Sequence, residues 1–209
     1  IYSMDGDFGD IAGIVDIAKK YNAMTFIDEV HAVGMYGKAG AGVSEELNLS
    51  NKIDIIQGTL GKAYGTMGGY ITSTELICDT IRSYASGFIF TTALPPALAK
   101  SSITSIKYLK KSNTERLLQK ENTICLKSYL KKANIPFLDN KTHIVPVMVN
   151  NPIKCKEISN ILLNEVGHYI QPINYPTVPA GSERLRITPG PLHTEKMISE
   201  FSQKIKNYP

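Results

Sequence analysis

The sequence lacks any apolar run of the roughly 18 residues that a membrane crossing requires. It also lacks a dense basic stripe with interleaved aromatic residues: the formal net charge is only +4, and the lysines are scattered apart from short pairs such as Lys110 and Lys111. A nucleic-acid-binding protein usually concentrates such charge. These absences argue against both classes. The mild positive balance suits acidic small molecules such as phosphates and CoA, or simply a solvated surface.

Cysteine is scarce. The three cysteines, Cys78, Cys125 and Cys155, are far apart and odd in number, which predicts a reducing compartment and no zinc site. Internal repeats and low-complexity tracts are also missing. The sequence starts at Ile1 rather than Met, and its first residues read as a strand that leads directly into a sheet, without a targeting segment. We therefore expect the chain to be part of a longer subunit.

What is present is an alternation of helical and strand patterns typical of an α/β layer. A helix is expected over residues 10–21, with Asp10 as N-cap and with Ile11, Ile14 and Val15 on its packed face. The 209 residues are enough for one or two cores. Further strands are expected at 24–27, 53–57, 69–73 and 88–90, and further helices at 44–49, 75–83 and 97–110.

The later part of the chain predicts helices over 114–133, 154–165 and 194–206, and strands over 144–149, 168–173 and 184–188. This order suggests a small α+β domain rather than more of the first sheet. We place the boundary so that residues 1–105 form a large domain and residues 106–209 a small one.

One glycine-rich stretch surrounds a single lysine. Residues 58–70 read GTLGKAYGTMGGY, with Lys62 between small residues. Glycines let a flat ligand approach the backbone closely, and a partly desolvated lysine condenses with an aldehyde. The hydroxyl of Thr59 is placed to face a phosphate or the same ring. The alternative is a flexible turn with a solvated lysine.

An acidic residue follows a short apolar strand in MTFIDEVHAVGMYG, residues 24–37. Because ligands of open α/β sheets bind beyond the carboxyl ends of strands, Asp28 is a candidate site residue. A buried carboxylate needs a cationic partner, and a protonated pyridine nitrogen would make the ring an electron sink, as in pyridoxal phosphate enzymes. His31 would then hydrogen-bond the ring's phenolic oxygen. The alternatives are a helix N-cap at Asp28 and a core histidine at His31.

Two adjacent threonines, Thr91 and Thr92, precede a pair of prolines and a predicted helix. Their hydroxyls and amides can hydrogen-bond a phosphate, and the positive end of the helix dipole would attract the phosphate as well.

In the small domain, Arg186 stands in an otherwise apolar strand and can form a two-pronged pair with a carboxylate. Arg184 has the same face parity and is expected to be the solvated one of the two.

These motifs resemble one known family. IDEVHAVGMYG, DIIQGTLGKAYGTMGGYI and RSYASGFIFTTALPP, extended by NYPTVP and RLRITPGPLHT, are similar to the α-oxoamine synthases among the fold-type I pyridoxal phosphate enzymes. The resemblance implies an aminotransferase-like large domain with a mostly parallel sheet, here partial, followed by the small α+β domain. It implies that Lys62 holds the pyridoxal 5'-phosphate and removes the substrate proton, while Asp28 and His31 bind its ring.

The same resemblance assigns further residues. It puts Ser3 beside the cofactor, and Thr91 and Thr92 at the cofactor of the opposite subunit of a homodimer. It makes Arg186 the group that holds the amino-acid carboxylate and Thr177 a contact of the acyl-CoA. Ser3 and Thr177 are read equally well as turn residues. The glycine-rich phosphate turn, the residue that stacks on the ring and part of the acyl-CoA pocket would precede this chain.

Within the family, NYPTVP favours glycine and succinyl-CoA as substrates. Sister enzymes use glycine with acetyl-CoA, alanine with pimeloyl-CoA, or serine with a long acyl-CoA. A catalytically silent scaffold subunit is the other alternative, against which the intact Lys62, Asp28 and His31 argue. The resemblance implies the mitochondrial matrix for a eukaryotic protein and the cytoplasm for a bacterial one.

Overall fold

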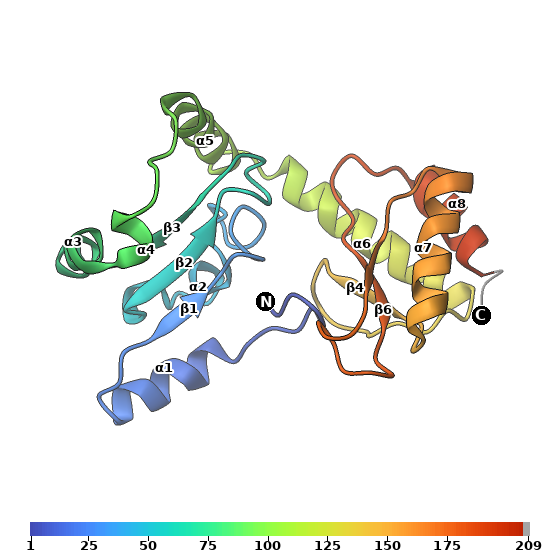
Figure 1. The fold of residues 1–209 in the computed structure, drawn as a ribbon, viewed down its shortest axis with the longest axis horizontal. Helices are drawn as coiled ribbons and strands as arrows, with labels where there is room; N and C mark the ends of the chain where they lie inside the picture. The colour runs from blue at the N-terminus through green and yellow to red at the C-terminus, as the bar shows by residue number, and fades with distance from the viewer. Residues whose placement is uncertain (207–209) are drawn as a thin grey trace. The chain divides into compact units, whose positions relative to one another are not determined.

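The computed structural model describes residues 1–206 and divides into two compact units (Figure 1). The first unit consists of Ile1 and Gly9–Asn113. The second unit consists of Tyr2–Phe8 together with the described residues from Thr114 onward. Within residues 1–206, no helix has the length and apolar character that crossing a membrane demands.

The sheet of the first unit has three strands in the order β1-β2-β3, which are Phe26–Asp28, Ile55–Thr59 and Gly69–Thr72. β1 and β2 are parallel, with Asp28 opposite Gln57, whereas β2 and β3 are antiparallel, with Gly58 opposite Tyr70. The expectation of a mostly parallel sheet is therefore corrected to a mixed sheet. The reason is the short loop 60–68, because a parallel return needs a crossover of about a dozen residues or more.

Helices surround this sheet in the chain order α1 (Ile11–Lys20), α2 (Val43–Glu46), the 3-10 turn η1 (Ser50–Lys52), α3 (Glu75–Tyr84), α4 (Ser86–Ile89) and α5 (Pro96–Leu109). α1 begins as predicted, since the Asp10 side chain accepts a hydrogen bond from the Gly13 N–H at 3.0 Å. Ile11 and Val15 enter a core cluster. Ile14, however, is 43% exposed, so its predicted place on the packed face is wrong.

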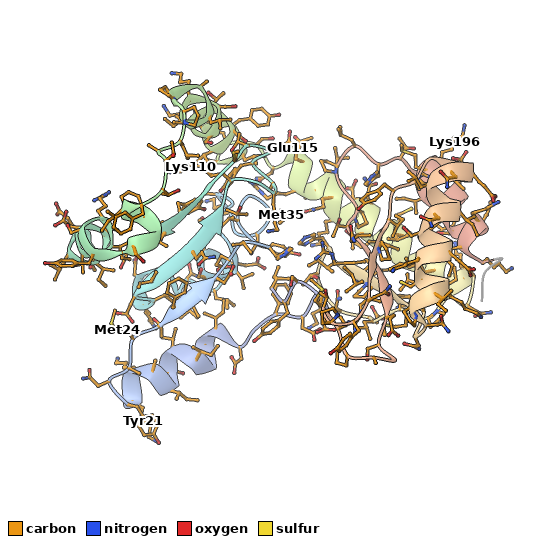
Figure 2. All side chains as sticks on the ribbon, in the orientation of Figure 1. Tyr21, Met24, Met35, Lys110, Glu115 and Lys196 are labelled. Carbon is orange, nitrogen blue, oxygen red and sulfur yellow. The ribbon has the colours of Figure 1, made fainter. Side chains whose placement is uncertain are left out.

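The turn after α1 carries large exposed side chains. Tyr21 is 70% exposed and Met24 66%, and Figure 2 shows Tyr21 pointing away from the ribbon.

The predicted strand at 88–90 is also wrong. Phe88 and Ile89 lie in α4, where both of their N–H groups donate to the carbonyl of Ala85 at 2.9 Å. A three-residue apolar run is too short for its periodicity to separate strand from helix.

The second unit is an antiparallel sheet packed with three helices. Its strands have the order β4-β6-β5, which are Val145–Met148, Arg184–Ile187 and Gln171–Ile173. Its helices are α6 (Thr114–Lys132), α7 (Pro152–Val166) and α8 (Glu195–Ile205). Their apolar faces form one core, which includes Leu126, Leu130, Leu162, Leu185 and Phe201. This is the α+β architecture expected for this part of the chain.

The strand β6 follows the period of two that one buried face imposes. Leu185 and Ile187 point into the core cluster, so Arg184 and Arg186 share the other face. The alternation thus brings two guanidinium groups to one side of the sheet.

Candidate active site

A closed loop between β2 and β3 displays Lys62. The Leu60 N–H donates to the Gly68 carbonyl, the Thr66 N–H to the Leu60 carbonyl and the Gly65 N–H to the Lys62 carbonyl, each at 2.9 Å. Gly65 and Gly68 have φ values of 64° and 112°, in the region that favours glycine. The Lys62 side chain is exposed. The glycines thus serve to close the loop beneath an accessible amine.

Helix α5 holds this loop in place. The Thr66 hydroxyl shares a 2.9 Å hydrogen bond with the Ser102 hydroxyl, and the Ser105 hydroxyl donates to the Tyr64 carbonyl at 2.8 Å. Tyr64 is buried in a small cluster with Val33, Leu60 and Leu109. Neither serine was predicted from the sequence as a support of this loop. Their spacing of three residues on one helix face was the available signal.

Thr59 turns its hydroxyl into the same loop. The hydroxyl donates to the Gly68 carbonyl at 3.3 Å and accepts from the Gly61 N–H at 3.2 Å. Its contact with a phosphate or with the cofactor ring stays a prediction.

Asp28 ends β1 as predicted, but it is exposed rather than buried. Its Oδ1 accepts a hydrogen bond from the Val30 N–H at 2.8 Å. The buried carboxylate is its neighbour Glu29, which is 0% exposed and accepts from the N–H groups of Val43 at 3.1 Å and Ser44 at 2.6 Å. Since successive side chains of an extended chain point to opposite sides, burial of Glu29 leaves Asp28 on the outer side. His31 is partly buried in the turn that follows.

Thr91 and Thr92 are exposed in the segment between α4 and α5. Pro96 occupies the first turn of α5, so the helix begins where the proline pair predicts. The helix therefore presents its N-terminal end close in sequence to both threonines. Their binding of a partner's cofactor stays a prediction.

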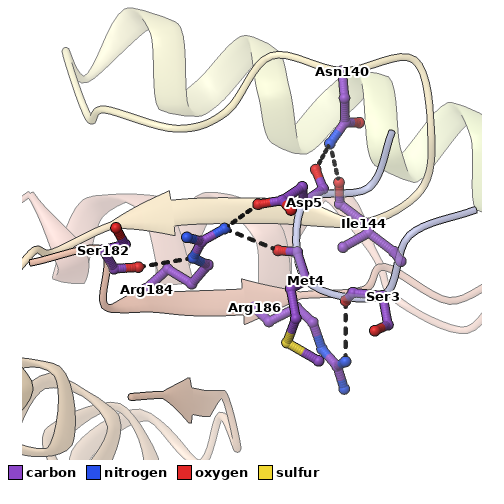
Figure 3. A network of polar contacts seen from close by, with 8 residues as sticks. All are labelled: Ser3, Met4, Asp5, Asn140, Ile144, Ser182, Arg184 and Arg186. Carbon is purple, nitrogen blue, oxygen red and sulfur yellow. Dashed lines mark hydrogen bonds and ion pairs between the residues drawn. The ribbon is translucent and has the colours of Figure 1, made fainter. Parts of the chain in front are cut away.

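In the second unit, Arg186 is partly buried and its Nη1 donates to the Ser3 carbonyl at 3.2 Å (Figure 3). The residue also lines a pocket of about 490 Å³ together with Gln171 and Thr188. The structure thus brings Ser3 and Arg186 together through the backbone of Ser3. The expected position of Ser3 beside the cofactor is not tested by this contact.

The prediction for Arg184 is wrong. This residue was expected to be solvated, but it is 5% exposed. Its Nη1 forms an ion pair with the Asp5 carboxylate and donates to the Met4 carbonyl at 3.2 Å, while its Nε donates to the Ser182 carbonyl at 2.9 Å. Met4 and Asp5 thus contact this guanidinium. Strand parity cannot reveal a contact that comes from a segment so distant in sequence.

The remaining polar candidates are loop or capping residues. Thr177 is exposed in the loop before β6, where its N–H donates to the Asn174 carbonyl at 2.9 Å. His193 accepts at Nδ1 from the Gly190 N–H at 2.8 Å. Among residues 1–206, no group of three or more His, Cys, Asp or Glu side chains is placed to hold a metal ion. Burial raises the pKa of the Cys155 thiol, so it is not an activated nucleophile.

The first unit thus carries a lysine on a closed glycine loop and an acidic residue at a strand end, and the second is an α+β unit; these are the features that the motifs predicted for a fold-type I enzyme. The family model described as aminotransferase class I and II matches residues 1–205, and the chain belongs to this family. The chain is 58% identical over 201 residues to a 5-aminolevulinate synthase of Rickettsia prowazekii (strain Madrid E), an alignment that covers 96% of this chain and 49% of that protein. It is 56% identical over 201 residues to the 5-aminolevulinate synthase of Rhizobium meliloti (strain 1021), covering 96% and 50%.

Solved structures share the fold. A serine palmitoyltransferase from S. paucimobilis superposes with a TM-score of 0.92 at 30% identity, covering 100% of this chain and 52% of that one. An 8-amino-7-oxononanoate synthase from Francisella tularensis gives a TM-score of 0.80 at 24% identity, covering 99% and 64%. The chain spans about half the length of the curated relatives it matches. These similarities confirm the resemblance that the motifs predicted.

Proposed function

We propose that the protein of which this chain forms about half the length is a 5-aminolevulinate synthase, an acyltransferase that condenses glycine with succinyl-CoA. The products are 5-aminolevulinate, CoA and carbon dioxide, the first step of haem and tetrapyrrole biosynthesis. The observation that carries the proposal is Lys62, accessible on a closed glycine loop, in a chain 58% identical to a 5-aminolevulinate synthase over 96% of its length.

The residues present fit pyridoxal 5'-phosphate, the cofactor that serine palmitoyltransferases of this fold bind, because Lys62 offers an accessible amine and Asp28 an accessible carboxylate. When bound, this cofactor supplies an electron sink. Lys62 would hold it, Asp28 would pair with its pyridine nitrogen and His31 with its phenolic oxygen. Asp28 stands at the carboxyl end of a strand, where ligands of such sheets bind. Ser3 and Thr59 are proposed as further neighbours.

Different side chains of this chain are proposed to act on different groups of glycine. The Lys62 amine in its neutral form removes a proton from the α-carbon of glycine. Arg186 orients the glycine carboxylate, because a guanidinium offers two parallel N–H groups to two carboxylate oxygens. Thr177 is proposed to contact the acyl-CoA.

We also propose a homodimer in which Thr91 and Thr92 of one subunit bind the cofactor phosphate of the other. Their exposed position next to the start of α5 supports this role. Because the relatives described above are bacterial, we assign the enzyme to a bacterial cytoplasm rather than to the mitochondrial matrix.

Two alternatives give different outcomes in one experiment. The full-length protein is assayed with pyridoxal phosphate for release of the CoA thiol in four pairings: glycine with succinyl-CoA, glycine with acetyl-CoA, alanine with pimeloyl-CoA, and serine with a long-chain acyl-CoA. Lys62→Ala is the control. We expect turnover with succinyl-CoA alone and none from the control. Turnover confined to another thioester would indicate a sister enzyme, such as 2-amino-3-ketobutyrate CoA ligase, or 8-amino-7-oxononanoate synthase if alanine and pimeloyl-CoA are the substrates. Absence of turnover with every substrate would indicate a scaffold subunit.

A further inference from the structure

The segment at the start of the chain forms a tight loop that belongs to the second unit. We call residues 2–7 the N-terminal loop. Its own backbone closes it, because the Gly6 N–H donates to the Tyr2 carbonyl and the Tyr2 N–H to the Asp7 carbonyl, both at 2.9 Å. It therefore packs on the sheet of the second unit as one defined turn.

Side chains of the second unit bind four consecutive carbonyls of this loop (Figure 3 shows the first three). Each carbonyl has a different donor: Arg186 for Ser3 at 3.2 Å, Arg184 for Met4 at 3.2 Å, Asn140 for Asp5 at 2.7 Å and Thr142 for Gly6 at 2.7 Å. Each bond fixes a further peptide unit, so the direction of the Ser3 carbonyl depends on its neighbours in the loop.

Packing at Gly6 shows how closely the loop is fitted. Gly6 has a φ of 75°, and a Cβ atom there would lie 2.4 Å from Asn140 Nδ2 and 2.8 Å from the Ile144 carbonyl. No larger residue fits without moving these groups. The loop consequently has little freedom to rotate on the sheet.

The ion pair between Asp5 and Arg184 is the charged contact of the loop. The Arg184 side chain is 6% exposed, whereas that of Asp5 is 49% exposed. A buried guanidinium needs a partner, and removing one member of such a pair leaves an uncompensated charge. Burial of the Arg184 guanidinium is therefore favourable only while the N-terminal loop keeps the Asp5 carboxylate beside it. Arg186 lies two residues along the same face of β6.

We propose that Arg184 is a positioning residue for Arg186 and thereby for the substrate carboxylate. Arg184 holds the loop through the Asp5 carboxylate and the Met4 carbonyl. The Ser3 carbonyl then binds Nη1 of Arg186 and fixes its guanidinium plane. This bond leaves the edge formed by Nε and Nη2 for a two-pronged pair with a carboxylate. The inference rests on the proposed role of Arg186.

The test compares two ligands of the full-length protein loaded with pyridoxal phosphate. Glycine carries the carboxylate, and methylamine is the same amine without it. Dissociation constants are measured by equilibrium titration for the wild type and for Arg184→Met, Asp5→Ala and Arg186→Met, together with the midpoint of thermal unfolding. Asp139→Ala is the matched control, because it removes an exposed ion pair with Lys131 in the same unit.

We expect Arg184→Met and Asp5→Ala each to raise the dissociation constant for glycine about tenfold, with that for methylamine within about twofold. A variant that combines Arg184→Met with Asp5→Ala should bind glycine no more weakly than the weaker-binding single variant. The reason is that both substitutions remove the same contact, the ion pair between Arg184 and Asp5. Asp139→Ala should match the wild type. If Arg184→Met does not fold, Asp5→Ala carries the test, since its side chain is half exposed.

A parallel loss of both ligands in Asp5→Ala and in any folded Arg184→Met would mean a purely structural role, and unchanged glycine binding would mean no role. Either result overturns the inference. Failure of the proposed role of Arg186 would look different: Arg186→Met would then bind glycine as well as the wild type does.

Discussion

Ser44 donates two hydrogen bonds to the Glu29 carboxylate, from its backbone N–H at 2.6 Å and from its hydroxyl. Both residues are 0% exposed. Glu29 follows Asp28 directly, and its second oxygen accepts from the Val43 N–H at 3.1 Å. The contact therefore joins the end of β1 to the start of α2 and fixes the backbone on which Asp28 stands.

We predict that Glu29→Gln lowers the free energy of unfolding of the full-length protein by about 2 kcal/mol, because an amide places N–H donors against N–H donors in a buried site. Chemical denaturation measures the change. Glu46→Gln, which changes an exposed carboxylate on α2, the helix that carries Ser44, is the matched control and should have little effect. Equal stability of the two variants would contradict the assigned contact.

The two left-handed glycines of the lysine loop should differ in their tolerance of alanine. A Cβ at Gly65 meets no atom within 4 Å, whereas one at Gly68, with φ at 112°, lies 3.0 Å from Leu94 Cδ1. We expect Gly65→Ala to cost about 1 kcal/mol of stability and Gly68→Ala about 2 to 3 kcal/mol. Denaturation of both variants in parallel measures the difference, and the reverse order would show that the loop closes differently.

Contacts between the lysine loop and α5 should matter for turnover. Ser105→Ala removes the 2.8 Å bond to the Tyr64 carbonyl and leaves that buried residue's backbone unsupported. We predict a fall in kcat of about tenfold, because the loop that presents Lys62 loses its fixed position. Ser101→Ala, on an exposed face of the same helix, should keep the wild-type kcat. Similar kcat values for both variants would rule out this support.

The Asp54 carboxyl contributes to the dependence of stability on pH. Hydrogen bonds from the N–H and hydroxyl of Thr25, at 2.7 Å and 2.9 Å, hold the pKa of Asp54 below its ordinary value of 3.8. The unfolded chain then binds this proton more readily, so the stabilisation is complete above 3.8 and is lost as pH falls through the lower pKa of the folded state.

Asp54→Asn should therefore be less stable than the wild type at about pH 7, with the gap narrowing at about pH 3. Denaturant titrations at both pH values measure the gap. Asp16→Asn, an exposed carboxylate on α1, is the control. A gap that stays constant between the two pH values would contradict the role given to Asp54.

Local patterns predicted most helices and strands because each depends on residues close in sequence. The Asp10 cap, the proline start of α5 and the alternation in β6 needed no distant partner. The strand expected at 88–90 failed because a short apolar run does not determine its own hydrogen-bond partners.

The site was predictable only in part, for a related reason. The glycines around Lys62 and the arginine in an apolar strand are local patterns, so their proposed roles can be predicted from the sequence. The burial of Arg184 depends on Asp5, and the exposure of Asp28 depends on Glu29 meeting Ser44. Such pairings arise from the tertiary fold, which residue spacing alone does not encode.

The proposed function depends first on Lys62 as the residue that carries the cofactor. The most direct measurement is to reduce the full-length protein, loaded with pyridoxal phosphate, with borohydride and to map the modified peptide by mass spectrometry. We expect one pyridoxyl group per chain, on Lys62, and none in Lys62→Ala. A pyridoxyl group on another lysine, or a catalytically active Lys62→Ala variant, would contradict this expectation.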